Sequence, residues 1–286
     1  AKGACFGEVA GWERTNWFAP AGKKAEYEYT YGRQNWFDYT AAECKATREA
    51  VAMFDQSSFG KFVLEGADAE QIINNVSAND MSVPVGKLVY TQWLNERGGI
   101  EADLTVTREA ADRYLVVTAA ATQVRDFQWL KNHIPADARA TLTDVTSGSA
   151  VLSIMGPNSR ALLQSLTSTD MSNEAFPFGT SQIIDLGYAR VRASRVTFVG
   201  ELGWELYIAT EYATGVFDAI VAVGDKFGLK HAGYHALNSM RTEKGYRHWS
   251  HDISPDDSPI EAGLGFTVAW NKAGGFIGRD ALLKQK

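Results

Sequence analysis

Apolar residues recur along the chain at spacings that predict helices and strands in irregular alternation. The capping box Thr40–Glu43 predicts a helix from Ala41 to about Met53, because its two polar side chains can bond free N–H groups of a first helical turn. Helical spacing also occurs at 68–76, 124–134, 156–166, 216–227 and 276–286. Strand patterns occur at 61–66, 104–106, 114–118, 149–155, 189–198 and 206–208.

This irregular alternation favours mixed α+β layers over a regular parallel βαβ series. A second succession of strands and helices begins near Ala150 and weakly echoes the first. We therefore expect two α+β halves, residues 1–149 and 150–286, with no charged linker or low-complexity tract between them. With 286 residues, the chain is long enough to bury a sizeable core.

Composition and charge exclude several classes of protein. Apolar residues make up 45% of the chain and charged residues 22%, and both values are ordinary for a globular protein. The net charge of −6 argues against a general nucleic-acid binder. No apolar run approaches the length of a membrane span. Cys5 and Cys44 lack metal-type spacing, so we expect free thiols.

The most informative local pattern is a glycine pair followed by a carboxylate. Gly98 and Gly99 permit a tight turn with positive φ, and Leu104–Val106 continues as a strand. Asp103 is therefore expected where a turn enters a strand, a position that can present one carboxylate into a cleft. The residues alone leave open that Asp103 only caps the turn, since aspartate is common in turns.

Short motifs follow one another along nearly the whole chain in an order typical of one family. They are Leu88–Asn95, Asn95–Leu104, Gly200–Glu205, Asn238–Tyr246, His251–Ile253, Ser258–Leu264 and Phe276–Arg279. Each motif alone is weakly specific, whereas the ordered set resembles the folate-binding aminomethyltransferase family, which includes the T-protein of the glycine cleavage system. The N-terminal stretch Phe6–Phe18 resembles more specifically the C-terminal halves of dimethylglycine and sarcosine dehydrogenases and oxidases.

The resemblance implies the mixed-sheet aminomethyltransferase fold with tetrahydrofolate as its ligand. In that family a small C-terminal β-barrel follows the folate-binding region, and in the dehydrogenase branch an FAD-binding half precedes it. We expect both to be absent from this sequence, which has no glycine-rich dinucleotide fingerprint after a first strand. FAD is therefore expected only in a separate domain or subunit.

Four residues are expected at the folate site because they match the family's motifs. Asp103 takes the catalytic position, and Glu205 matches the glutamate that accepts hydrogen bonds from the amino-pyrimidine edge of the pterin. Two carboxylate oxygens suit that edge because they can accept from a forked pair of donors. Tyr90 matches a pocket-lining tyrosine, and Phe198 stands where the family often has tyrosine. The residues alone leave open that Glu205 is a solvated strand residue and Tyr90 an ordinary core aromatic.

Two departures from the T-protein pattern weaken a strict T-protein assignment and matter less for the dehydrogenase branch. Leu237 stands where T-proteins carry an arginine, and Ala119 stands where they carry an asparagine. No metal site is expected at His248, His251 and Asp252, because their spacing is not a standard ligand set.

The resemblance thus implies an enzyme, a tetrahydrofolate-binding one-carbon transfer module. Oxidation of an N-methyl amine of the dimethylglycine or sarcosine type yields an iminium ion or formaldehyde, which the module would capture as 5,10-methylenetetrahydrofolate. Its expected partner is an FAD-dependent amine-oxidising domain or subunit, in the cytoplasm of a bacterium or the mitochondrial matrix of a eukaryote. Neither nucleic acid nor a membrane is an expected partner.

Three alternatives stay open at this point. The chain could be a non-catalytic folate-binding or regulatory paralogue, a glycine-cleavage T-protein, or a folate-dependent demethylase. Retention of Asp103 argues against the first, and Phe6–Phe18 favours the oxidase branch over the other two.

Overall fold

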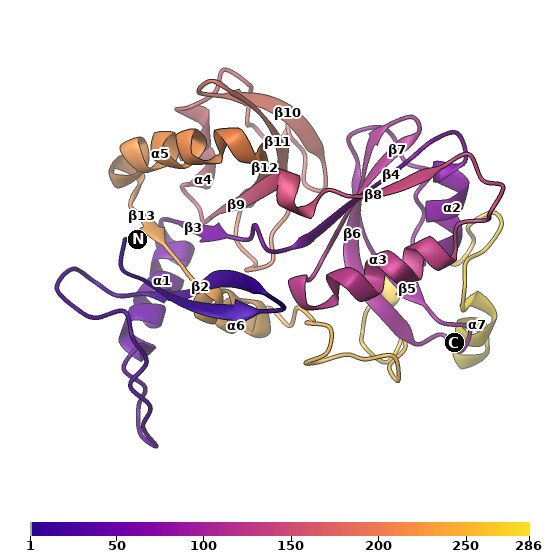
Figure 1. Cartoon of the computed structure of the whole chain (residues 1–286), viewed down its shortest axis with the longest axis horizontal. Helices are drawn as coiled ribbons and strands as arrows, with labels where there is room; N and C mark the ends of the chain where they lie inside the picture. Colours follow the sequence, from indigo (N-terminus) through magenta and orange to yellow (C-terminus); the bar gives the residue numbers. More distant parts are fainter. Residues whose placement is uncertain (1) are drawn as a thin grey trace. The chain divides into compact units, whose positions relative to one another are not determined.

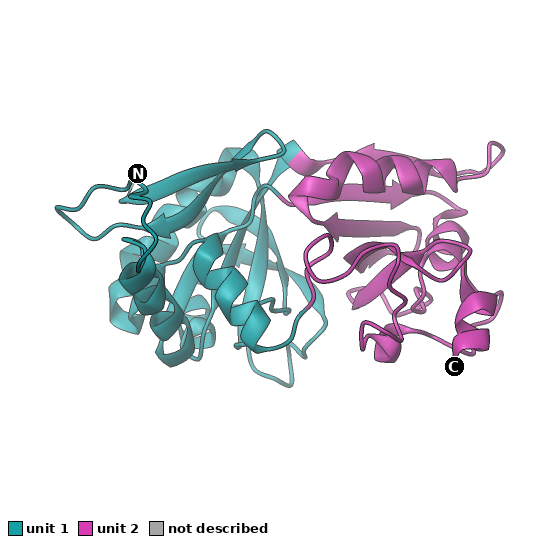
Figure 2. Cartoon of the chain, turned by 90° about the horizontal axis from the view of Figure 1, so that it is seen from below, with its two compact units in different colours: residues 1–58, 147–246 teal, residues 59–146, 247–286 magenta. Residues whose placement is uncertain are grey.

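The computed structural model describes residues 2–286 as two compact units, each assembled from two separate stretches of chain. Unit 1 comprises Ala1–Ser58 and Ser147–Tyr246, and unit 2 comprises Phe59–Thr146 and Arg247–Lys286 (Figure 2). Each unit combines a sheet with helices (Figure 1), so the expected mixed α+β fold is confirmed. The units do not follow the expected halves 1–149 and 150–286, because each unit also takes in a distant stretch of chain.

Strand pairing explains why unit 1 is discontinuous. Its six-stranded sheet has the order β10–β11–β12–β9–β3–β13, in which β3 from the first stretch pairs antiparallel with β9 from the second. Only the edge strand β13 runs parallel to its neighbour β3. The bounds are β3 Val51–Asp55, β9 Ser149–Met155, β10 Ser181–Leu186, β11 Ala189–Ser194, β12 Gly203–Ala209 and β13 Leu229–His231.

Helices cover both faces of this sheet and define its two cores. The helices are α1 Phe37–Glu49, α4 Ser159–Gln164, α5 Ala213–Gly224 and α6 Tyr234–Glu243. One face carries Trp204, Leu206 and Ile208, which pack with residues of α4 and α5. The opposite face carries Phe54 and Met155, which pack with residues of α6. Because side chains alternate along a strand, neighbours of Trp204 on β12 point to that second face.

The first helix differs from the sequence-based expectation. It spans Phe37–Glu49 rather than 41–53, and the residues after it form β3, because Val51–Asp55 are drawn into the sheet by pairing with β9. The capping box prediction was wrong, since the helix has Trp36 at its N-cap. Glu43 instead accepts hydrogen bonds from the backbone N–H groups of Phe18 at 2.7 Å and Gly233 at 3.0 Å.

Glu43 thereby ties a hairpin to the rest of unit 1. The hairpin consists of β1 Ala4–Val9 and β2 Trp12–Phe18, paired antiparallel. Phe18 ends β2, and Gly233 is the N-cap of α6, so one carboxylate on α1 holds two elements that are far apart in sequence.

Unit 2 is built on an antiparallel five-stranded sheet. The sheet has the order β5–β6–β7–β4–β8. Its bounds are β4 Gly60–Glu65, β5 Leu88–Leu94, β6 Ile100–Ala110, β7 Arg113–Thr118 and β8 Thr141–Asp144, with helices α2 Ala69–Val76, α3 Gln123–Asn132 and α7 Arg279–Gln285. Trp93, Leu104 and Val106 face a core that includes Ile73 of α2 and Leu130 of α3.

The C-terminal stretch completes unit 2 by covering a second apolar cluster. Leu94 and Ile100, which flank the β5–β6 turn, pack with Ile253, Leu264 and Leu282. This explains why residues 247–286 belong to unit 2 despite their distance along the chain. Within residues 2–286, no helix combines the length and apolar character needed to cross a lipid bilayer.

Candidate functional site

The turn at Gly98 and Gly99, which precedes Asp103, is capped by Asn95. Gly98 has φ +85°, and a side chain on Gly99 would collide with the backbone oxygen of Pro255. Asn95 caps this turn, because its Oδ1 accepts the N–H groups of Arg97 and Gly99, each at 3.0 Å. Asp103 is therefore not the turn cap, and it lies within β6 rather than at its entrance.

Tyr90, Gln92 and Asp103 lie on one face of the unit 2 sheet. Gln92 and Asp103 are direct Cα partners across β5 and β6, and Tyr90 lies two residues before Gln92. This face is opposite to the one that packs against α2 and α3, because Trp93 and Ala102 take the alternate positions. The Gln92 amide Nε2 donates to Asp103 Oδ1 at 2.8 Å, and the Tyr90 hydroxyl also bonds to Asp103. The structure thus brings together the two candidates of unit 2.

The surroundings of Asp103 make its carboxyl easier to protonate than an aspartate in water. Burial raises the pKa of this carboxyl to about 6, while the hydrogen bonds from Gln92 and Tyr90 partly offset that rise. Burial, followed by the nearby charge of Asp103, raises the pKa of the Tyr90 hydroxyl well above its usual range. At neutral pH Asp103 is an ionised acceptor close enough to its pKa to gain a proton, as a general base requires.

Glu205 is buried in unit 1 and is not a solvated strand residue. It is 7% exposed and faces away from the Trp204 core, between its Cα partners Ser194 on β11 and Ser153 on β9. The Tyr207 hydroxyl, two residues along β12, donates to Glu205 Oε2 at 2.6 Å. Burial raises the pKa of Glu205, and the Tyr207 hydrogen bond lowers it. A buried carboxylate held by one neutral donor can still accept from a ligand.

Phe198 lies outside the strand predicted at 189–198. β11 ends at Ser194, and Thr197 then closes a turn by accepting the N–H groups of Val199 and Gly200 through its hydroxyl. The Phe198 ring stacks with Tyr246 at a centroid distance of 6.1 Å and packs against the cluster that contains Leu237 of α6. It therefore forms part of an aromatic wall in unit 1.

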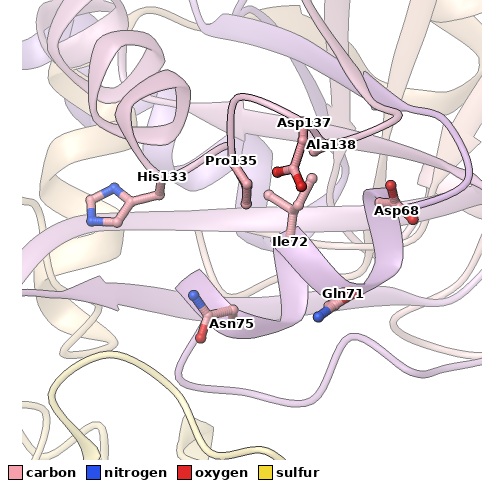
Figure 3. A pocket seen from close by; sticks show the side chains of 8 residues that line it. All are labelled: Asp68, Gln71, Ile72, Asn75, His133, Pro135, Asp137 and Ala138. Carbon is pink, nitrogen blue, oxygen red and sulfur yellow. The ribbon is translucent and has the colours of Figure 1, made fainter.

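A polar pocket in unit 2 lies apart from these residues. It has a volume of about 320 Å³ and lies between α2 and the segment that follows α3 (Figure 3). Its lining residues are Asp68, Gln71, Ile72, Asn75, His133, Pro135, Asp137 and Ala138. Asp68 already accepts the Arg139 backbone N–H at 2.8 Å and pairs with its guanidinium at 3.1 Å. None of the four candidate residues lines this pocket.

Sequence reasoning missed two residues that contact the candidate carboxylates and one that contacts them only indirectly. Gln92 bonds to Asp103 and Tyr207 bonds to Glu205, whereas Thr267 bonds to Gln92. A two-residue period along a strand could have revealed Tyr207, because it follows Glu205 on the same face. Thr267 had no local signal, since it lies 175 residues from Gln92.

Two curated proteins are similar to nearly the whole chain. It is 47% identical over 282 residues to 4-methylaminobutanoate oxidase (formaldehyde-forming) from Paenarthrobacter nicotinovorans, with 99% of this chain and 34% of that protein covered. It is 39% identical over 323 residues to mitochondrial sarcosine dehydrogenase from Mus musculus, with 100% and 35% covered. The chain thus spans about a third of the length of these relatives.

A solved structure and a family model agree with these similarities. The glycine cleavage system aminomethyltransferase T from Bartonella henselae matches with a TM-score of 0.82 and 25% identity, over 99% of this chain and 71% of that one. The model of the GCVT N-terminal domain matches residues 1–272. Because this match covers most of its length, the chain belongs to the GCVT N-terminal domain family and has the aminomethyltransferase fold.

Proposed function

We propose that this chain binds tetrahydrofolate and captures a one-carbon unit from N-methyl amine oxidation as 5,10-methylenetetrahydrofolate. The observation that carries the proposal is Asp103, a carboxylate with neutral partners on a sheet face and a pKa of about 6. Similarity to a formaldehyde-forming oxidase and to sarcosine dehydrogenase supports the substrate class, because both names denote oxidation of N-methyl amines.

Each candidate residue has a separate task in this proposal. Glu205 accepts hydrogen bonds from the amino-pyrimidine edge of the pterin, for which a carboxylate has the right pair of acceptors. Tyr90 and Phe198 are aromatic side chains of the kind that packs against flat rings. A buried carboxylate fits a ligand rich in donors, because burying it without such partners costs free energy.

The proposed chemistry needs one base and little other assistance. Folate, when bound, supplies the two nitrogens that take up the carbon. When an iminium carbon is transferred, two carbon–nitrogen bonds to folate form and both bonds to the departing amine nitrogen break. Of the two N–H protons that folate loses, one leaves with the amine and one is released. Asp103 accepts the released proton, and its charge stabilises the positive charge that develops beforehand. Holding the reactants in place supplies much of the remaining rate.

The donor of the carbon is an amine-oxidising domain or subunit that carries FAD, as in the branch that the chain most resembles. In a bacterium this assembly would be cytoplasmic, and in a eukaryote it would lie in the mitochondrial matrix. The name of the Mus musculus relative, a mitochondrial sarcosine dehydrogenase, supports the second location for eukaryotic members.

Anaerobic titration calorimetry with tetrahydrofolate tests the binding step. We expect saturable heat from the wild-type chain and a weaker affinity in a Glu205→Ala variant that remains folded. An exposed surface variant, Glu96→Ala, serves as the matched control, because it removes a carboxylate that is not a candidate residue. Absence of binding to the wild-type chain at millimolar tetrahydrofolate would contradict the proposal.

A further inference from the structure

Gln92 is a buried amide directly opposite Asp103. Its side chain is 0% exposed, its Cα pairs with that of Asp103, and its Nε2 donates to Asp103 Oδ1 at 2.8 Å. A buried amide needs partners at both ends, because an unpaired buried polar group costs about 1–3 kcal/mol. The Thr267 hydroxyl supplies the second partner, since it donates to Gln92 Oε1.

Thr267 is a neighbour that can orient this amide by donating to its oxygen. The two ends of a glutamine amide are nearly equal in shape, so neighbouring donors and acceptors set its direction. The single Thr267 hydroxyl proton has two acceptors within reach, Gln92 Oε1 and the Leu264 carbonyl oxygen at 2.7 Å. When Thr267 donates to Gln92, the amide must turn its NH₂ toward Asp103, and Asp103 must present an acceptor.

We propose that Gln92, oriented by Thr267, is the positioning residue for Asp103. It holds Oδ1 as a hydrogen-bond acceptor, so that proton uptake falls to the other carboxylate oxygen. The inference rests on the proposed role of Asp103 as the base. Because the amide donates to a lone pair, it favours the ionised carboxylate and opposes the effect of burial.

Few charged or titratable groups share this environment. The Tyr90 hydroxyl on β5 bonds to Asp103, and the Arg247 charge acts on Tyr90. Glu101, two residues earlier on β6, is paired with Arg125. Gln92 is thus one of two neutral side chains that hydrogen-bond to Asp103. Replacing it should change the pH at which the Asp103 carboxyl titrates.

Two variants test the inference. Gln92→Met keeps the length of the side chain and removes the donor, whereas Thr267→Val keeps the shape and removes only the orienting hydroxyl. Gln128→Met is the matched control, because it makes the same change at an exposed position on α3 of the same unit. NMR titration of isotope-labelled aspartate carboxyl carbons, assigned by comparison with Asp103→Asn, reports the Asp103 midpoint without requiring activity.

We expect the Asp103 midpoint to rise by about one unit in Gln92→Met, the effect of one hydrogen bond to a charged group, and by less in Thr267→Val. Gln128→Met should leave it unchanged. In single-turnover transfer, the acid limb of the rate profile should move by the same amount, with folate affinity preserved. If Gln92→Met does not fold, Thr267→Val decides the question.

If the Asp103 midpoint does not move in a folded Gln92→Met variant, the inference is overturned and Gln92 is only a packing residue. If only Thr267→Val folds, an unmoved midpoint in that variant has the same meaning. Absence of transfer by the wild-type chain would instead overturn the proposed function. In that case the midpoint measurement still judges the contact between Gln92 and Asp103, so the two failures are distinguishable.

Discussion

Asp103 and Glu205 share one physical situation at the scale of single residues. Each is a carboxylate on the sheet face away from a strongly apolar core, and each accepts a hydrogen bond from a neutral side chain. Burial raises the pKa of both groups. Such residues lower the stability of the folded chain, so their presence is better explained by a function than by folding.

Replacing Asp103 with asparagine should stabilise the chain and slow transfer. Burial raises its pKa from 3.8 to about 6, so the folded state binds the proton more tightly than the unfolded state. Wild-type stability should therefore fall as pH rises through this window. The neutral variant should gain about 1–3 kcal/mol in unfolding free energy above pH 6, and less near pH 4. Urea denaturation at both pH values measures this, and an equal gain at both would contradict it.

In the same variant, transfer should fall by about ten- to a thousand-fold, because the charge and the proton acceptor are lost. Folate affinity should change little, since the amide keeps the shape of the carboxyl. The measurement is single-turnover formation of 5,10-methylenetetrahydrofolate with an iminium-generating partner. An unchanged rate would mean that positioning alone drives the transfer.

Variants of Glu205 and Tyr207 should separate two effects: direct contact with the ligand, and orientation of the Glu205 carboxylate by Tyr207. Glu205→Ala should weaken folate binding by about 1.5–3 kcal/mol, the usual loss for a hydrogen bond to a charged group. Tyr207→Phe leaves the carboxylate and removes only its 2.6 Å donor, so it should weaken binding by a smaller amount. Calorimetry on both variants gives the comparison. If the two losses were reversed in order, Tyr207 rather than Glu205 would be the main ligand contact.

At the scale of elements, α1 shows how a tertiary contact overrides a local motif. Glu43 bonds the end of β2 and the N-cap of α6, while the Thr40 hydroxyl is buried without a hydrogen-bond partner among the described residues. The polar residues of the apparent capping box therefore serve no cap. One of them joins three elements of unit 1.

Thr40→Val and Glu43→Ala should consequently differ in sign or size. The first removes an unpaired buried hydroxyl and should be neutral or stabilising, whereas a true cap would cost about 0.5–2 kcal/mol. The second leaves two buried N–H groups unpaired and should cost about 2–4 kcal/mol. Burial raises the Glu43 pKa from 4.5 to about 7, so wild-type stability should decline across that range and the alanine variant should lack this decline. Denaturation of both variants at several pH values measures these effects.

At the scale of the whole molecule, each unit depends on chain segments that are distant in sequence. Residues 247–286 supply Leu264 and Leu282 to the cluster around Leu94 and Ile100, and they also supply Thr267 to Gln92. Unit 1 draws its own core from other stretches. Loss of the C-terminal stretch should therefore affect the units unequally.

A chain that ends at Tyr246 should lose amide protection in unit 2 and keep it in unit 1. Exposure of Leu94 and Ile100 to water should speed hydrogen exchange in β5 and β6 by about tenfold or more, because local stability sets exchange. Exchange in β9 and β12 is the internal control, since their core contains no residue beyond 246. Equal loss of protection in both units would contradict this.

The sequence by itself determined the elements with strong local periodicity and the candidate carboxylates. The strand expected at 149–155 is β9, and the helix expected at 68–76 contains α2, because burial on a fixed face imposes a fixed spacing. The order of motifs placed Asp103 and Glu205 in a known family, as the match to residues 1–272 confirmed. Their roles at the folate site stay predictions.

Only the tertiary structure decided which residues surround those carboxylates and which segments make up each unit. Gln92 meets Asp103 through strand register, and Thr267 reaches Gln92 across 175 residues of chain. Neither pairing produces a periodic pattern in the sequence, because a hydrogen bond between distant segments needs only one suitable side chain at each end. For the same reason Glu43 was mistaken for a cap. Local spacing records burial, whereas partners are set by how the chain returns on itself.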